Sequence, residues 1–142
     1  MPAHPDDHDG PDHTATVRQF FDTWTRGDVD ALVGYFAEQG TWQEAHRPAA
    51  RGAEELRPVF EMQVGFGTDF DFQFRLLAQV DGHRVVTERV DSWTYEEVRM
   101  TVEVMGVFEF DEDGRITRFR DYYDWADLAA QLTAAGVELP PD

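Results

Sequence analysis

The second half of the chain alternates apolar and polar residues, and tight-turn signals separate the alternating segments. In the first segment, polar residues alternate with large apolar ones, which are Phe70, Phe72, Phe74 and Leu76. This period of two is typical of a strand with one buried face. Asp81-Gly82 then predicts a hairpin. Further strands are predicted over residues 84–93, 98–110 and 116–122. Consecutive hairpins favour an antiparallel meander.

Helical periodicity marks the segment that precedes these strands. A first helix is predicted with Thr14 as its cap and Gly27 as its stop, because apolar residues recur at i, i+3, i+4 and i+7, namely Val17, Phe20, Phe21 and Trp24. Asp28 is expected to cap a second helix, which would bury Val29, Leu32, Val33 and Phe36.

Shorter elements complete the expected order. A strand over residues 41–44 and a loop over 46–52 should lead into a third helix over 53–63, which Pro58 is expected to bend or break. After the last strand, Asp124 is expected to cap a final helix near residues 126–132.

This order predicts the α+β class, with N-terminal helices packed on one curved and mostly antiparallel sheet. A pocket is expected between the helices and the sheet. Residues 1–13 carry three prolines and no apolar pattern, so we expect a disordered acidic arm there. Residues 14–142 are expected to form a single domain.

The charge balance argues against two classes of partner. The chain has 29 acidic and 12 basic residues, a net charge of -17, which disfavours nucleic acids and anionic membranes. No apolar run approaches the roughly 18 residues of a membrane-spanning helix. The Asp- and His-rich N-terminus does not have the pattern of a signal peptide, so a cytoplasmic location is expected.

Missing residue types narrow the chemistry further. The chain contains no Cys, Lys or Asn, and its only serine is Ser92. Disulfides, thiol nucleophiles and lysine Schiff bases are therefore excluded. The histidines lack metal-ligand spacing and no Gly-rich phosphate loop is present, so we expect neither metal nor cofactor. An enzyme of this composition would use carboxylates, arginine, aromatic hydroxyls and water.

Strand parity brings charged residues together. Residues i and i+2 of a strand share a face, so Arg89 and Asp91 should project together, and Asp121 should share a face with Phe119 and Tyr123. If both faces line one pocket, an arginine lies between two carboxylates. Such an arrangement can keep one carboxyl protonated and the other ionised, which suits a general acid and a general base.

Several motifs in this order carry a family resemblance. They are Tyr35–Glu38, Thr87–Asp91, Gly106-Val107-Phe108, Gly114–Thr117 and Arg120-Asp121-Tyr122. With them the chain resembles the limonene-1,2-epoxide hydrolases. These belong to a larger group of cone-shaped α+β proteins (SnoaL-like or NTF2-like) that includes nuclear transport factor 2 and ketosteroid isomerase.

The resemblance implies a mechanism and a role for each charged residue. Asp91 would protonate the epoxide oxygen, Asp121 would take a proton from water, and Arg89 would bridge them. In the family, a Tyr and an Asn on the strand entering the pocket help to hold the water, and here those positions are Trp42 and Glu44. We therefore expect Glu44 to act as a water ligand or as a base.

The expected ligand is a hydrophobic small molecule. An apolar pocket is predicted from Trp42, Phe21, Trp24, Trp93, Val102, Val104, Phe119, Tyr123 and Leu128. The resemblance also implies a homodimer. Two other functions stay open: a cyclase that opens an epoxide with a substrate hydroxyl (polyether-type, or SnoaL-like in natural-product biosynthesis), and a non-catalytic module that binds small molecules.

Overall fold

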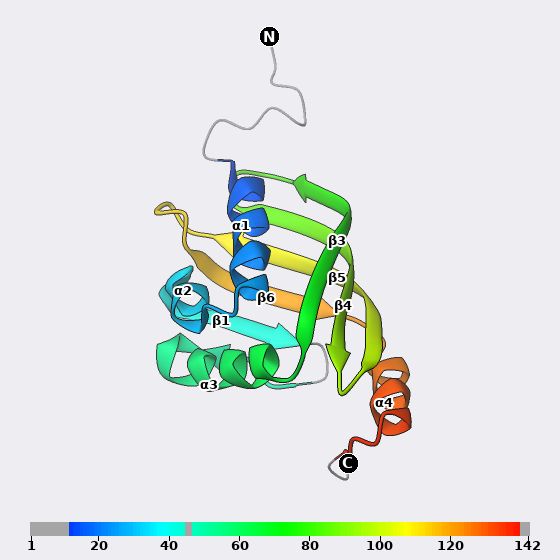
Figure 1. The fold of residues 1–142 in the computed structure, drawn as a ribbon. Coiled ribbons are helices and arrows are strands. Elements are labelled where there is room, and N and C mark those ends of the chain that lie inside the picture. The colour runs from blue at the N-terminus through cyan, green and yellow to red at the C-terminus, as the bar shows by residue number, and fades with distance from the viewer. Residues whose placement is uncertain (1–11, 45–46, 140–142) are drawn as a thin grey trace.

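A single curved sheet of six strands forms the frame of the molecule (Figure 1). The computed structural model describes residues 12–44 and 47–139, and the predicted acidic arm lies almost entirely outside these ranges. The strand order is β2-β1-β6-β5-β4-β3. All neighbouring strands are antiparallel except β1 and β6, which are parallel. The α+β prediction is confirmed.

The first helix, α1 (His13–Thr25), lies across the inner face of the sheet (Figure 1). Its N-cap is Asp12, whose side chain accepts a hydrogen bond from the backbone N–H of Thr14. The prediction of Thr14 as the cap is therefore wrong. His13 is the first residue of the helix. Its ring is buried and stacks on Phe110, with ring centroids 4.3 Å apart.

The second helix is shorter than predicted. Asp28 caps α2 (Val29–Gly34) as expected, but Phe36 begins strand β1 (Phe36–Glu44) instead of ending the helix. The cause is tertiary, because Tyr35 accepts a backbone hydrogen bond from Ile116 at 2.9 Å and Phe36 pairs with Ile116. A two-residue strand, β2 (Ala50–Arg51), pairs with β1 inside the segment predicted as a loop.

The third helix continues through its proline. Helix α3 (Gly52–Gly65) contains Pro58, so the prediction of a break there is wrong. Leu56 and Phe60 lie on either side of Pro58 and are fully buried. This burial offsets the loss of one intrahelical hydrogen bond.

The four long strands agree with the predicted meander. They are β3 (Thr68–Gln79), β4 (Arg84–Tyr95), β5 (Val98–Phe110) and β6 (Ile116–Tyr122), followed by α4 (Trp125–Ala134) with Asp124 as its cap. Glu96 and Glu97 form the turn between β4 and β5 with φ of 43° and 70°. Positive φ at both turn residues is typical of two-residue hairpin turns, because the twist of such a turn matches the right-handed twist of the flanking strands.

One irregularity in β3 changes a predicted face. Phe74 pairs with Arg89 but Leu76 pairs with Glu88, so the register shifts between them. Leu76 therefore leaves the face of Phe70, Phe72 and Phe74 and is 45% exposed on the outer side. The simple alternation predicted for this strand holds only up to Phe74.

The core lies between the helices and the inner face of the sheet. Helices α1 and α3 contribute Phe20, Phe21, Trp24 and Phe60 to it, and the sheet contributes Trp42, Phe108 and Phe119. Phe20 makes edge contacts with several of these rings. In the ranges that the structure describes, no helix has the length and apolar character needed to cross a membrane.

Candidate active site

Four strands contribute to one polar row across the inner face of the sheet. The parallel pairing of β1 with β6 sets Glu44 beside Asp121. Antiparallel pairing then sets Asp121 beside Gly106, and Gly106 beside Thr87. Directly paired residues point to the same face. The adjacent row is apolar and consists of Trp42, Phe119, Phe108 and Val85.

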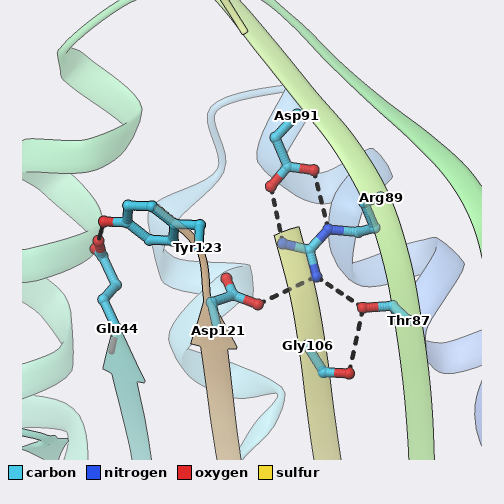
Figure 2. Close-up of polar contacts among 7 residues, drawn as sticks. All are labelled: Glu44, Thr87, Arg89, Asp91, Gly106, Asp121 and Tyr123. Atoms are coloured by element: carbon cyan, nitrogen blue, oxygen red, sulfur yellow. Dashed lines mark hydrogen bonds and ion pairs between the residues drawn. The ribbon is translucent and has the colours of Figure 1, made fainter. Parts of the chain in front are cut away.

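Arg89 connects this row to Asp91 (Figure 2). Its Nε and Nη2 donate to the two carboxylate oxygens of Asp91 at 2.9 and 2.8 Å. Its Nη1 donates to Asp121 Oδ1 at 3.1 Å and to Thr87 Oγ1 at 2.9 Å. Thr87 in turn donates to the carbonyl oxygen of Gly106 at 3.4 Å. One guanidinium thus bridges the two carboxylates that strand parity singles out.

The arginine is buried more deeply than its partners. The Arg89 side chain is 0% exposed, whereas the side chains of Asp91 and Asp121 are 13% and 10% exposed. Phe21 of α1 covers the guanidinium, with Cζ 4.5 Å from the ring centroid. A buried cation is costly unless it is paired, and here two carboxylates compensate it. The carboxylates, not the arginine, are the charged groups that a ligand can reach.

The surroundings of Asp121 change its acidity. Burial raises the pKa of Asp121 to about 7 from its ordinary 3.8. Arg89 acts in the opposite direction, while the charges of Asp91 and Glu44 raise the pKa further. A carboxyl with a pKa near neutrality can both take up and release a proton at physiological pH. Asp121 therefore has the acidity that proton transfer at neutral pH requires.

Two donors from different elements hold Glu44. Gln63 of α3 donates through Nε2 to Glu44 Oε1 at 2.6 Å. The hydroxyl of Tyr123 donates to Glu44 Oε2 (Figure 2). Burial and the charge of Glu44 raise the pKa of Tyr123 above its ordinary 10.0, so the hydroxyl stays protonated at neutral pH. Gln63 is absent from the sequence prediction, because only the packing of α3 against β1 brings it to the site.

Four of the aromatic side chains predicted to bind substrate are part of the core, namely Phe21, Trp24, Trp42 and Phe119. Trp42 is stacked between Phe60 and Phe119, with ring centroids 4.8 and 5.9 Å away, and Trp24 meets Trp42 edge-on at 5.7 Å. The indole N–H groups of Trp24, Trp42 and Trp93 are buried without a hydrogen-bond partner in the part of the chain that the structure describes. Such donors are costly when unpaired, so they suit a polar ligand atom or water.

The remaining predicted pocket residues lie on the other side of the polar row. They belong to a second apolar cluster and are Val102, Val104, Leu128, Trp93 and Tyr123. Val102 pairs with Asp91, and Val104 pairs with Arg89. The charged cluster therefore lies between the aromatic core and this second apolar cluster, and both groups of predicted residues border it.

Other candidate sites are less well formed. Within residues 12–44 and 47–139, no three His, Asp or Glu side chains are placed to hold a metal ion together. An open hollow lies on the opposite face of the sheet, away from the charged cluster, and is lined by Thr41, Gln43, Ala49, Arg51, Glu109, Thr117 and Arg118.

Fold and site together define a class: a cone-shaped α+β protein with an arginine-bridged pair of carboxylates on the inner face of its sheet. The chain belongs to the SnoaL-like domain family, whose model matches residues 17–119. The matched range contains Arg89 and Asp91 and ends two residues before Asp121.

Known relatives support the predicted resemblance. The chain is 28% identical over 123 residues to the epoxide hydrolase EphG of Mycobacterium tuberculosis, covering 87% of this chain and 80% of that protein. It is similar to the structure of an LEH-like epoxide hydrolase from the same organism, with a TM-score of 0.72, 27% identity and coverage of 86% of this chain and 90% of that one.

A third relative shares the fold. It is the epoxide hydrolase/cyclase-like enzyme SalBIII, which acts in pyran ring formation in the polyether salinomycin. The TM-score is 0.72 at 22% identity, with coverage of 81% of this chain and 92% of that one. The resemblance to epoxide hydrolases of the limonene-1,2-epoxide hydrolase type is thus confirmed at the level of family and fold.

Proposed function

We propose that this protein is an epoxide hydrolase that adds water to a hydrophobic epoxide in one step and releases a vicinal diol. The observation that carries the proposal is the contact of one buried guanidinium, that of Arg89, with both Asp91 and Asp121. The relationship to epoxide hydrolases of Mycobacterium tuberculosis supports the same reaction.

The two carboxyl groups divide the proton transfers between them. A water oxygen forms a bond to an epoxide carbon while Asp121 takes a proton from that water. The carbon–oxygen bond of the ring breaks, and Asp91 gives a proton to the leaving oxygen. The pair therefore starts with one proton in all, on Asp91, and ends with one on Asp121. Acid and base assistance of this kind contributes about 10²–10⁴-fold for each group.

Arg89 makes this division of protons feasible. Two ionised carboxylates at one site repel each other, so a single proton shared between them is the favoured state. The positive charge of Arg89 balances the remaining negative charge, and its three hydrogen bonds fix the orientation of both groups. No covalent intermediate and no cofactor enters the proposed step.

The attacking water is proposed to lie near Glu44 and Trp42. Glu44 lies beside Asp121 in register, and donors from Gln63 and Tyr123 fix its carboxylate. Trp42 adds a buried N–H without an acceptor among the described residues. Together they would replace the Tyr and Asn that hold water in the limonene-1,2-epoxide hydrolases. A fixed water contributes an orientation advantage to the reaction.

The substrate is proposed to be hydrophobic, and the protein to be a homodimer. Aromatic and aliphatic side chains border the charged cluster on both sides. On the outer face of the sheet, a cross-strand row consists of Leu76, Glu88, Met105 and Tyr122. Its three apolar side chains are 45%, 44% and 49% exposed. A second copy of the chain would cover these three apolar side chains.

A panel of terpene, aromatic and hydroxy-substituted epoxides tests the proposed activity. Chiral gas chromatography of the products should show a vicinal diol from at least one hydrophobic member, and the Asp91→Asn protein should form none above background. Binding of the compounds without turnover by the native protein would instead support a non-catalytic module.

A cyclase is the second candidate, and the position of Glu44 favours it. Arg89 binds two carboxylates, and a third, that of Glu44, is held next to Asp121. A base at this place can deprotonate a substrate hydroxyl instead of water, and the alkoxide then opens the epoxide to a cyclic ether. Hydroxy-epoxides in the same panel separate the two functions, because they yield a triol by hydrolysis and a ring by cyclisation.

A further inference from the structure

We propose that Gly106 is a positioning residue, because its missing side chain allows Arg89 to cross β5 and join Asp91 to Asp121. The inference rests on the proposed function only for its effect on turnover. Its geometric part concerns the charged cluster itself and can be tested without any substrate.

The ion pair of Arg89 with Asp121 connects two strands that are not neighbours. Arg89 is on β4 and Asp121 is on β6, and β5 lies between them. Next-nearest strands are separated by about 9–10 Å, twice the usual spacing. Gly106 of β5 pairs directly with Thr87 on one side and with Asp121 on the other. The guanidinium therefore reaches Asp121 over the position of Gly106 (Figure 2).

A side chain at position 106 would occupy the space of the hydrogen bonds. A Cβ there would lie 2.6 Å from Asp121 Oδ1, 2.7 Å from Arg89 Nη1 and 2.8 Å from Thr87 Oγ1. These are the three atoms joined by the two Nη1 hydrogen bonds. All three are ends of side chains, so the backbone can stay in place while the side chains are pushed apart.

The backbone itself gives no reason for a glycine at this position. Gly106 is not among the glycines with positive φ, and it lies inside the regular ladder of β5. Glycine in a strand interior is less favourable than alanine by about 0.5–1 kcal/mol. A glycine inside a strand, away from turns and bulges, often marks a place where another group approaches the backbone closely. Here the approaching group is the guanidinium of Arg89.

Separation of Arg89 from Asp121 has a defined chemical consequence. Asp121 faces Arg89 and Asp91 from β4, Glu44 from β1, and Tyr123 just after its own strand. Of these, only Arg89 favours the ionised carboxylate. A methyl group at position 106 should therefore raise the pKa of Asp121, while both hydrogen bonds from Arg89 to Asp91 remain.

The test follows the aspartate carboxyl carbons by ¹³C NMR during a pH titration of Gly106→Ala, with Asp121→Asn to assign the signal. We expect the Asp121 midpoint to move up by at least one pH unit relative to the native protein. Turnover of any epoxide accepted by the native protein should fall by ten-fold or more, with the acidic limb of its pH profile displaced upward.

Gly40→Ala is the matched control. A Cβ at Gly40 would also be crowded, 2.6 Å from the carbonyl oxygen of Ile116, but it touches none of the charged cluster. This variant should lose stability and keep the Asp121 midpoint within about 0.3 pH units. An unchanged midpoint in Gly106→Ala, or an equal shift in Gly40→Ala, would overturn the proposal.

A second variant keeps the test decisive if Gly106→Ala alone fails to fold. The double variant Thr87→Ala, Gly106→Ala removes one of the three crowded atoms, and it is compared with Thr87→Ala alone. We expect the same upward shift. Unfolding of both Gly106 variants would overturn the proposal, which requires that only side chains move. A native protein that opens no epoxide would contradict the proposed hydrolysis and leave the NMR result decisive for Gly106.

Discussion

Asp91 accepts two hydrogen bonds from Arg89, at 2.9 and 2.8 Å, through both of its carboxylate oxygens. Asp121 accepts only one, at 3.1 Å. The arginine is therefore shared unequally between the two carboxylates, and Asp121 lies in the more buried part of the cluster, with a pKa raised to about 7.

The pH dependence of turnover should report the ionisation of Asp121. Burial raises the pKa of Asp121 to about 7, and a general base must be ionised in order to act. We therefore expect kcat/KM to rise about ten-fold per pH unit below this value and to fall again at higher pH, once Asp91 no longer holds the proton that it must give. The measurement is the initial rate of diol formation between pH 5 and 9. A rate that falls through pH 7 would assign the acid to Asp121 and reverse the proposed roles.

The same group should make the native protein less stable as the pH rises. Its pKa is about 7 in the folded protein against an ordinary 3.8, so between these values the folded state binds more protons than the unfolded state. This contribution to the free energy of unfolding is complete below pH 4 and lost by pH 7, on the order of 4 kcal/mol.

Urea unfolding at pH 5 and pH 8 measures this effect. The stability loss between these two pH values should be larger for the native protein than for Asp121→Asn, which has no carboxyl to ionise at this position. Asp71→Asn is the control, because Asp71 is exposed on β3 and should leave the pH dependence unchanged. Equal pH dependence in the native protein and Asp121→Asn would contradict the raised pKa.

Removal of either carboxyl group should nearly abolish turnover. Asp91→Asn and Asp121→Asn are each expected to reduce kcat by about 10²–10⁴-fold, because each removes one proton transfer. Circular dichroism should show that both variants still fold. Asp71→Asn again serves as the control and should keep the native rate. Substantial activity in either site variant on a confirmed substrate would overturn the assigned roles.

Substitutions of Glu44 should show whether this residue positions the attacking water or acts as the general base. We expect Glu44→Gln to keep the rate within about ten-fold, since an amide can still position water, and Glu44→Ala to lose about 10²-fold. Because the charge of Glu44 raises the pKa of Asp121, both variants should move the acidic limb of the pH profile downward. Loss of nearly all activity in Glu44→Gln would make Glu44 the base. An unchanged rate and profile in Glu44→Ala would place it outside the mechanism.

The oligomeric state tests the proposed outer-face contact. Light scattering should give the mass of two chains at working concentration, and Met105→Glu should shift the protein to a monomer, because it would bury a second carboxylate directly beside Glu88. Met62→Glu, at a similarly exposed methionine on α3, is the matched control for an added negative charge. A native protein that is already monomeric would refute the dimer.

The long strands and the parity of their charged residues could be predicted because they depend on local alternation. The arrangement of Arg89 with Asp91 follows from a separation of two residues on one strand. The errors arose where distant contacts decide local structure. Phe36 joins a strand because it pairs with Ile116, and Leu76 changes face because of a register shift. Neither event leaves a signal in the neighbouring residues.

The candidate site was predictable to the same degree. Arg89, Asp91 and Asp121 could be named from the sequence, because their spacing along the strands places them on one face and because they match motifs of a known family. Gln63 could not, because it is an ordinary polar residue near the end of a helix and reaches Glu44 only through the packing of α3 against β1. The close approach of Arg89 to Gly106 likewise becomes visible only when three strands are in register.

Isotope labelling tests one-step hydrolysis most directly. A single turnover of a confirmed epoxide substrate is run in H₂¹⁸O with protein in excess, and both the product and the protein are examined by mass spectrometry. The account predicts one ¹⁸O atom in every diol molecule and none in the peptides that contain Asp91, Asp121 or Glu44. An unlabelled first diol with ¹⁸O in one of these peptides would show a covalent intermediate, and an unlabelled cyclic ether would show a cyclase; either result would contradict the proposed hydrolysis.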